Sequence, residues 1–290
     1  MAATVEKPLV VIVGPTASGK TSLAVELAKK LNGEIICADS RTVYKDMDIG
    51  TAKPTAAEQA EVPHWGLDLA TPGQRFTAAD FKDYAVHKIA EIRQRNKTPF
   101  LVGGTGLYVD SVMFDYEFGS DVSITQREKL EEMTLTELHE YCIKNNTNLP
   151  ENHLNKRYVI RAIERKSTSE KSNSQLLANT IVVGIATDTK TLRTRIADRT
   201  EQLFANGVVQ EAIMLGKKYG WNNEAMTGNI YPLLHQHLLE NVSLEITKQK
   251  FTTLDIRLAK RQMTWFRRNP HIEWCSLAEA EQYVSNHLVP

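Results

Sequence analysis

The sequence predicts an α/β fold in which a mostly parallel sheet is flanked by helices and carries a helical insertion. Four short apolar runs that suit buried strands alternate along the chain with segments of helical periodicity. A long acidic stretch, 112–150, shows no strand pattern. We therefore expect an α/β core domain made of 1–114 and 176–290, and a helical insertion at 115–175.

The first two strands enclose a glycine-rich loop and a helix. PLVVIV (8–13) is a continuous apolar run, which is typical of a strand buried on both faces. GPTASGKT follows it, and SLAVELAKKL then repeats Leu23, Leu27 and Leu31 at helical spacing. GEIICADS (33–40) is a second strand that ends in polar residues.

The remaining core elements continue the alternation. FTAADFKDYAVHKIAEIRQRNK (76–97) has one apolar helical face, and TPFLVGGTGLY (98–108) predicts a strand that breaks at its glycines. TIVVGIA (180–186) predicts a fourth strand, and the helix after it ends near 206–207. Ligands of such a sheet gather at the carboxyl ends of its strands.

Composition excludes several classes of protein. The chain has no apolar run of the roughly 18 residues that a membrane span needs, and its start lacks the features of a signal peptide, so we expect a cytoplasmic protein. Cys37, Cys142 and Cys275 are far apart, which argues against disulfides and a zinc site. His235 and His237 could form a metal pair but have no evident companions.

The charge is balanced overall but unevenly distributed. Lys and Arg number 35, as do Asp and Glu. Residues 115–140 hold eight acids against two bases, residues 156–171 six bases against two acids, and residues 248–268 seven bases against one acid. Such segments are typical of a protein with one basic face, although solvated helices also produce them. Nucleic-acid binding is thus an open possibility on charge alone.

GPTASGKT fits the phosphate-binding pattern GxxxxGK[ST], and the strand before it and the helix after it supply the required context. In such a loop backbone N–H groups surround an anion, the lysine reaches its terminal phosphate and the last hydroxyl ligates Mg²⁺. We expect a phosphate group here, with Mg²⁺ on Thr21. The binding residues would be Gly14, Pro15, Thr16, Ala17, Ser18, Gly19, Lys20 and Thr21. ATP or GTP is the common ligand, which makes a kinase or an ATPase the first interpretation.

A hydrolytic use of this loop lacks a partner. An ATPase needs a carboxylate at the end of a later strand, whereas FLVGG offers none. Asp39 is the nearest acid, and it could act through the metal, serve as a general base or cap a helix. Thr105, in the glycine turn GGTG, could bind a ligand or belong to a plain strand-to-helix turn.

The C-terminal segment LDIRLAKRQMTWFRRNP (254–270) interleaves bases with aromatic residues. That combination suits a folded nucleic acid, which offers phosphates and unstacked bases. A helix with Trp265 in the core and solvated arginines would give the same pattern.

Eight motifs follow one another along almost the whole chain: GPTASGKT, ADS (38–40), YKDMDIGTAKP (44–54), PHWGLD (63–68), FTAADF (76–81), LVGGTGLY (101–108), RYVIRAIE (157–164) and AKRQMTWFRR (259–268). The set resembles the tRNA dimethylallyltransferases, the isopentenyl transferases of tRNA. The resemblance implies a core like that of the small P-loop kinases. It also implies transfer of a dimethylallyl group from dimethylallyl diphosphate to the N6 amine of the adenine 3′-adjacent to the anticodon, with Mg²⁺ as cofactor and a monomer as the working form.

The resemblance also assigns roles to residues. Asp39 would take the proton from the amine, Lys20 and the rest of the phosphate loop would hold the diphosphate, and Thr105 would help to place the substrate. The tRNA, through its anticodon stem-loop, would contact Asp39, Ser40, Arg41, Thr42, Thr105, Arg127, Arg157, Arg161, Arg261 and Gln262. This chemistry activates no water, which explains the missing hydrolytic carboxylate.

The chain departs from the family at residues 228–231. The family has a glycine followed by an aromatic residue, a base and an acid or amide, and this chain has GNIY. That stretch touches tRNA in the family, so the departure bears on tRNA binding. Three alternatives stay open: an adenylate isopentenyltransferase acting on free AMP, ADP or ATP, a small-molecule kinase, and a non-catalytic RNA-binding relative.

Overall fold

The computed structural model describes residues 6–118, 124–167 and 175–288. Parts of the two charged segments at 115–140 and 156–171 lie outside the described residues. The strands are β1 (Leu9–Val13), β2 (Gly33–Ala38), β3 (His64–Trp65), β4 (Thr98–Gly103), β5 (Thr180–Ile185) and β6 (Glu273–Cys275). The helices are α1 (Lys20–Lys30), α2 (Ala56–Glu61), α3 (Ala78–Gln94), α4 (Gly106–Met113), α5 (Ile124–Glu132), α6 (Leu135–Lys144), α7 (Lys156–Ser167), α8 (Thr189–Ala205), α9 (Val208–Tyr219), α10 (Ile230–Glu240), α11 (Leu244–Phe266) and α12 (Leu277–Leu288), with a 3₁₀ turn at Ala225–Thr227.

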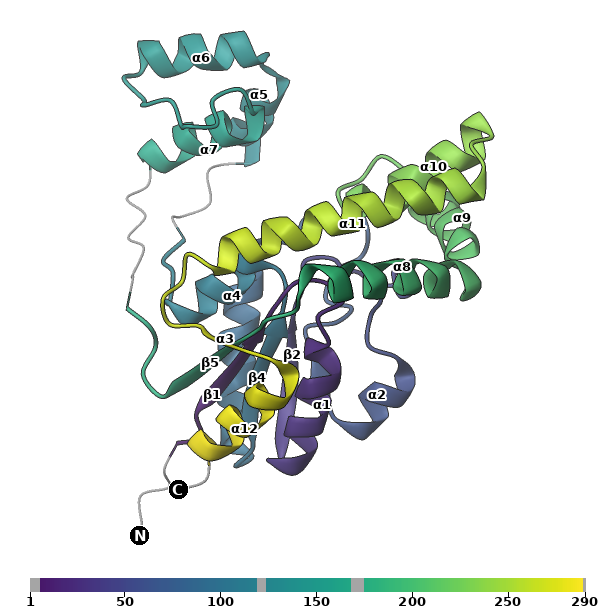
Figure 1. Ribbon diagram of the computed structural model, residues 1–290. Coiled ribbons are helices and arrows are strands. Elements are labelled where there is room, and N and C mark those ends of the chain that lie inside the picture. The colour runs from purple at the N-terminus through teal and green to yellow at the C-terminus, as the bar shows by residue number, and fades with distance from the viewer. Residues whose placement is uncertain (1–5, 119–123, 168–174, 289–290) are drawn as a thin grey trace. The chain divides into compact units, whose positions relative to one another are not determined.

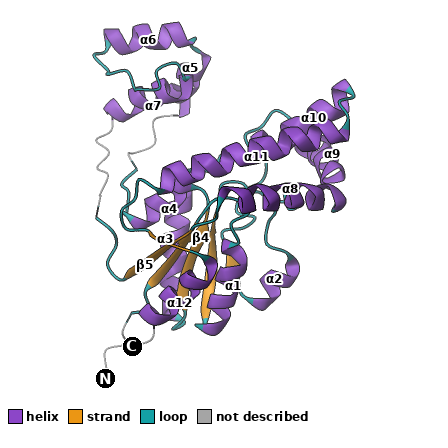
Figure 2. Cartoon of the chain, viewed as in Figure 1, coloured by secondary structure: helices purple, strands orange, loops and turns teal. Residues whose placement is uncertain are grey.

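The chain divides into two compact units, Met1–Met113 with Leu176–Pro290, and Phe114–Gln175. The first unit holds a six-stranded sheet of order β3-β2-β4-β1-β5-β6 in which each pairing is parallel. Figure 2 shows these strands in orange between helices. The predicted α/β class with a mostly parallel sheet is confirmed.

Helices cover the two faces of this sheet, as Figure 1 shows. α1 and α12 contact one face, where Val10, Ile12, Ile35 and Phe100 form a fully buried core with them. α3 and α4 contact β4 from the other face. Burial on both faces explains why the strands read as continuous apolar runs and not as alternating patterns.

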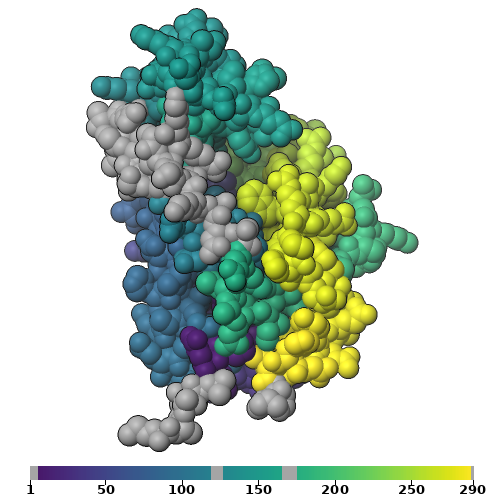
Figure 3. Space-filling model, turned by 90° about the vertical axis from the view of Figure 1, so that its left-hand side faces the viewer, coloured from purple at the N-terminus to yellow at the C-terminus, as the bar shows by residue number. Residues whose placement is uncertain are grey.

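The C-terminal part of the chain covers one side of the first unit, where it appears yellow in Figure 3. Its longest helix, α11, lies beside α8 and α10 and also reaches α4. The helix begins at a serine cap, since the Ser243 side chain accepts from the N–H of Ile246. Because α11 contacts elements distant in sequence, its residues can meet loops from the first half of the chain.

The second unit has its own small core. Leu130 of α5, Leu138 and Cys142 of α6, and Val159 and Ile163 of α7 are buried together. α6 begins with a capping box between Thr134 and Glu137. The three helices match the strandless pattern of this stretch.

Two short strands escape sequence reasoning. β3 contains two residues and β6 three, and both lie at the edges of the sheet. Neither is long enough to form an apolar run that a sequence pattern could reveal. Of the three alternatives for Asp39, the helix cap is wrong. The residues after it form turns, and the next helix, α2, begins at Ala56 with a cap at Thr55.

Candidate active site

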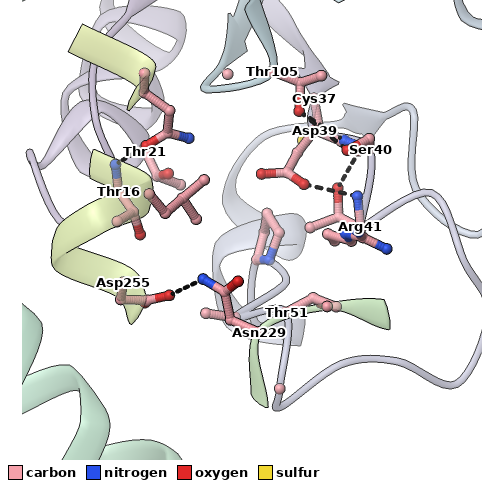
Figure 4. Close-up of a pocket in the computed structure, with 18 of the residues that line it drawn as sticks. Thr16, Thr21, Cys37, Asp39, Ser40, Arg41, Thr51, Thr105, Asn229 and Asp255 are labelled. Carbon is pink, nitrogen blue, oxygen red and sulfur yellow. Dashed lines mark hydrogen bonds between the residues drawn. The ribbon is translucent and has the colours of Figure 1, made fainter. Parts of the chain in front are cut away.

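A pocket lies where three neighbouring strands end. The registers place Val13 opposite Gly103, and Gly103 opposite Ala38, so the residues that follow these strands start from one edge of the sheet. The pocket has a volume of about 290 Å³. Figure 4 shows Thr16 and Thr21 on one side of it and Asp39, Ser40 and Thr105 on the other.

The phosphate loop forms the first wall. Gly19 has φ of 91° at the start of α1, a left-handed conformation that favours glycine and turns the chain into the helix. Lys20 Nζ donates to the carbonyl of Pro15 at 3.2 Å. Burial lowers the pKa of Lys20 to about 8, with the charge of Arg199 lowering it further and that of Asp39 opposing the shift. An anion against this amine would favour its charged form.

Two arginines of α8 reach the same loop, and sequence reasoning missed both. Arg199 Nη1 donates to Thr16 Oγ1, and Arg195 Nη1 donates to the carbonyl of Ser18 at 3.2 Å. The Nε of Arg199 and the Oγ of Ser18 are buried and have no hydrogen-bond partner among the described residues. Orphaned buried donors beside a phosphate loop fit an anionic ligand. The signal was present in the sequence, since arginines four apart share one helix face.

The second wall carries Asp39. Its Oδ1 accepts from the N–H of Arg41 at 2.8 Å, and Figure 4 shows the carboxylate directed into the pocket. Thr105 Oγ1 accepts from the N–H of Ser40 at 3.0 Å, which ties the turn after β4 to the segment after β2. The Oγ1 of Thr42 donates to the carbonyl of Asp39 at 3.4 Å. These contacts fix the backbone on which the carboxylate stands.

Arg41 also joins this wall to a distant segment. Its Nη1 donates to the carbonyl of Glu224 at 3.0 Å and to Thr227 Oγ1 at 3.3 Å. The guanidinium therefore links the residues after β2 to the 3₁₀ turn that precedes GNIY.

α11 closes the pocket through Gln262. Its Oε1 accepts from the N–H of Thr16 at 2.8 Å, and its Nε2 donates to the carbonyl of Gly104 at 3.1 Å. A Cβ on Gly104 would stand 2.4 Å from Gln262 Nε2, and one on Gly106 would stand 2.2 Å from Trp265. Gly104 and Gly106 thus let α11 approach closely, whereas the sequence left open a turn that approaches a ligand or a plain strand-to-helix turn.

A further carboxylate enters the pocket from α11. Asp255 is buried, and its Oδ1 accepts from Asn229 Nδ2 at 3.0 Å (Figure 4). Burial raises the pKa of Asp255, the Asn229 hydrogen bond and the charge of Arg199 oppose that shift, and the charge of Asp39 adds to it. The pocket is therefore lined by two acids, Asp39 and Asp255, and by four Lys or Arg residues: Lys20, Arg41, Arg199 and Arg261.

Comparison with known proteins identifies the family. The IPP transferase family model matches residues 42–269. A tRNA dimethylallyltransferase of Bacillus anthracis is 37% identical over 287 residues, which covers 94% of this chain and 91% of that protein. The chain belongs to the IPP transferase family. The resemblance expected from the eight motifs, and with it an enzyme of the transferase class, is confirmed.

Solved structures of this family share the fold. The full-length tRNA isopentenylpyrophosphate transferase of Bacillus halodurans has a TM-score of 0.74 and 35% identity, with 98% of this chain and 97% of that chain covered. A tRNA isopentenylpyrophosphate transferase of Staphylococcus epidermidis gives 0.71 and 33%, with 97% of each chain covered. A eukaryotic dimethylallyltransferase acting on tRNA, at 22% identity and a TM-score of 0.76, has the same fold over 97% of this chain and 77% of that chain.

The second unit of this IPP transferase family member holds the other arginines expected to contact tRNA. Arg127 Nε donates to Glu131 at 2.9 Å, and its Nη1 donates to the buried Glu164 at 2.8 Å. Arg161 Nη1 reaches the other oxygen of Glu164 at 3.4 Å. Arg157 lies on the first turn of α7. Glu164 thus fixes guanidinium groups of two helices.

α11 and the residues just after it present a basic surface, which shares Arg261 with the pocket. Its lining residues are Arg257, Lys260, Arg261, Thr264, Trp265 and Arg268. Trp265 is 38% exposed, and its Nε1 donates to Asp110 Oδ2 at 2.7 Å. Trp265 is therefore partly buried, since the indole packs over Gly106 and also faces solvent.

Asp110 is expected to make stability depend on pH. Burial raises its pKa to about 6, although the Trp265 hydrogen bond opposes the shift, and its Oδ1 has no partner among the described residues. Because the folded pKa exceeds the unfolded one, ionisation destabilises the fold as pH rises through about 4 to 6. Asp110→Asn should therefore gain stability relative to wild type by about 2 kcal/mol between pH 4 and pH 8. Urea unfolding at both pH values tests this, and a difference that does not change with pH would contradict it.

The two histidines and three cysteines considered as metal ligands in the sequence have other contacts or are buried. His235 stacks on Trp221 with 4.2 Å between ring centroids, and His237 Nδ1 contacts the carbonyl of Val242. Across the described ranges no group of three or more His, Cys, Asp or Glu residues could hold a metal ion. The three cysteines are buried free thiols. Nor does any helix in the described part of the chain have the length and apolarity needed to cross a membrane.

Proposed function

We propose that this protein transfers a dimethylallyl group from dimethylallyl diphosphate to the N6 amine of the adenine 3′-adjacent to the anticodon of tRNA. The observation that carries the proposal is one pocket that joins the phosphate loop after β1 to the carboxylate after β2, two strands away in the sheet, in a chain of the IPP transferase family. The B. anthracis relative bears the name of this activity.

The diphosphate would lie against the loop 14–21. Lys20, the N–H groups of the loop and the orphaned Arg199 Nε supply positive charge and hydrogen bonds to a group that leaves with three negative charges. The Thr21 hydroxyl lines the pocket and fits Mg²⁺, which keeps waters and substrate phosphate oxygens as most of its ligands. When bound, Mg²⁺ would neutralise charge on the diphosphate.

Asp39 would act as the general base. The N6 lone pair attacks C1 of the donor, the C1–O bond breaks with its electrons moving to the diphosphate, and the N6 proton passes to the Asp39 carboxylate. Arg41 holds that carboxylate through its N–H, and Thr105 holds the adjoining Ser40. The adenine must leave its stack to reach this pocket, as in other enzymes that act on a base.

The tRNA itself would bind the basic surface of α11. Arg257, Lys260, Arg261 and Arg268 offer phosphate contacts, and the exposed face of Trp265 offers a stacking surface. We also propose that Arg127, Arg157 and Arg161 of the second unit contact tRNA. We propose that the enzyme works as a monomer in the cytoplasm.

A labelling experiment tests the proposal. Donor labelled in its prenyl group is incubated with unmodified tRNA or with AMP, and labelled ATP is supplied in a parallel reaction. We expect label in tRNA alone, located by nuclease digestion at the adenosine that follows the anticodon. Label on AMP would indicate an adenylate isopentenyltransferase, transfer from ATP would indicate a kinase, and no transfer would indicate a non-catalytic RNA-binding protein.

A further inference from the structure

We propose that Glu211 is a positioning residue for the acceptor side of this pocket, which it shapes by holding the turn at residues 48–50. The inference rests on the proposed function, because it concerns how the pocket receives the adenine of tRNA. Glu211 lies on α9, far from the phosphate loop in sequence, and no sequence motif pointed to it.

The carboxylate of Glu211 is buried and accepts four hydrogen bonds. Its Oε2 accepts from the N–H of Asp48 at 2.9 Å and of Ile49 at 2.6 Å. Its Oε1 accepts from the N–H of Gly50 at 2.8 Å and from the Tyr231 hydroxyl at 2.9 Å. Each oxygen thus receives two hydrogen bonds from neutral groups. Hydrogen bonds to an ionised acceptor are roughly twice as strong as neutral ones, so this arrangement fixes three successive backbone units.

The turn held in this way forms part of the pocket. Gly50, Thr51 and Ala52 line the same cavity as Asp39 and Ser40. A Cβ on Gly50 would stand 2.6 Å from the Tyr231 hydroxyl, so the backbone at this point packs directly on Tyr231. A displacement of the turn would therefore change the shape of the cavity beside the proposed base.

The buried Lys53 holds the other end of this loop. Its Nζ donates to the carbonyl of Tyr44 at 3.0 Å, to Asp48 Oδ1 at 2.6 Å and to Asp68 Oδ1 at 2.7 Å. Glu211 binds the backbone of residues 48–50, and Lys53 binds Tyr44, Asp48 and Asp68. These contacts fix the conformation of the loop without a ligand. Such preorganisation is required for accurate placement of a reacting group.

Tyr231 gives the unusual GNIY segment a function. Ile230 is buried, and Asn229 Nδ2 donates to Asp255. The Tyr231 hydroxyl donates to Glu211 Oε1. The four residues of GNIY therefore line the pocket and bind its other walls through Asp255 and Glu211.

The variant Glu211→Gln tests the inference. Its amide NH₂ replaces one carboxylate oxygen, so at least one of the three backbone N–H groups loses its acceptor. We expect kcat/KM for tRNA to fall by about 10- to 100-fold, as misplacement of a substrate typically causes, with KM for the donor within about threefold of wild type. Amide hydrogen exchange of residues 48–50 should accelerate. Tyr231→Phe, which keeps the three N–H bonds, should give the same pattern at smaller size.

Lys218→Ala is the matched control. Lys218 also lies on α9 and also ties down this loop, but through an exposed ion pair with Asp46 outside the pocket. It should leave both kinetic parameters unchanged. Unchanged tRNA kinetics in Glu211→Gln, or equal losses for both substrates in step with lost folded protein, would overturn the inference. If Glu211→Gln does not fold, the test falls to Tyr231→Phe. Amide exchange at residues 48–50 and tRNA kinetics equal to those of wild type in that variant would overturn the inference. Absence of transfer by wild type would instead overturn the proposed function.

Discussion

Replacing Asp39 with asparagine is expected to lower kcat for prenyl transfer to tRNA by about 10²- to 10⁴-fold, the usual contribution of a general base. Asparagine has nearly the same shape, and its Oδ1 can still accept from the N–H of Arg41, which holds the aspartate now. The turn should therefore survive, and only the ability to take a proton is lost. Single-turnover rates with saturating donor and tRNA measure the effect directly.

Two further measurements separate chemistry from binding. The Kd for tRNA should change by less than about threefold in Asp39→Asn, since the N–H bond and the neighbouring contacts remain. Asp255→Asn is the matched control, because it removes a negative charge from another wall of the same pocket. Its rate should stay within about tenfold of wild type. Equal rate losses in the two variants would show that pocket charge matters and that Asp39 is not the base.

Replacing Lys20 with alanine should weaken the binding of dimethylallyl diphosphate by about 10²-fold. A hydrogen bond to a charged group contributes about 1.5–3 kcal/mol, and alanine would leave the diphosphate without this partner. Isothermal titration of the donor measures the loss. Lys29→Ala removes a cation from the exposed end of the same helix, where it pairs with Glu61, and should bind the donor as wild type does.

The pH dependence of donor binding should identify Lys20 as its source. Because burial lowers the pKa of Lys20 to about 8, the ligand-free amine loses its proton above that pH, and an anion must then recharge it. The apparent Kd of wild type should rise up to about tenfold per pH unit above pH 8, with proton uptake on binding. A Kd that stays constant from pH 7 to pH 9.5, or the same rise in Lys20→Ala, would contradict the assignment.

The sequence predicted the framework of this site well because the relevant signals are local. The run PLVVIV, the glycine loop and the leucines of α1 follow one another directly, and strand ends of a parallel sheet meet at one edge. Motif order and strand ends alone therefore place Asp39 and Thr105 near the loop. The hydrogen bond from the N–H of Ser40, next to Asp39, to Thr105 Oγ1 agrees with this placement.

Other parts of the site depend on contacts that no local pattern encodes. Gln262 lies 246 residues from Thr16 and Glu211 lies 163 residues from Asp48, yet hydrogen bonds join each pair. The glycines of GGTG are compatible with a ligand or with a helix in the sequence, and only packing shows that α11 takes the space. The pKa values of Lys20 and Asp110 likewise follow from burial, which depends on the whole fold.

The amino-acid sequence by itself determined the α/β class, the phosphate loop with its helix, and the family, since periodicity and motif spacing are properties of the chain. Only the tertiary structure decided what encloses the pocket: the arginines of α8, the Gln262 contact, and the turn held by Glu211 and Tyr231. The physical reason is that a motif specifies its own backbone conformation, whereas the partner of a buried polar group is whichever distant segment the packing brings within hydrogen-bond distance.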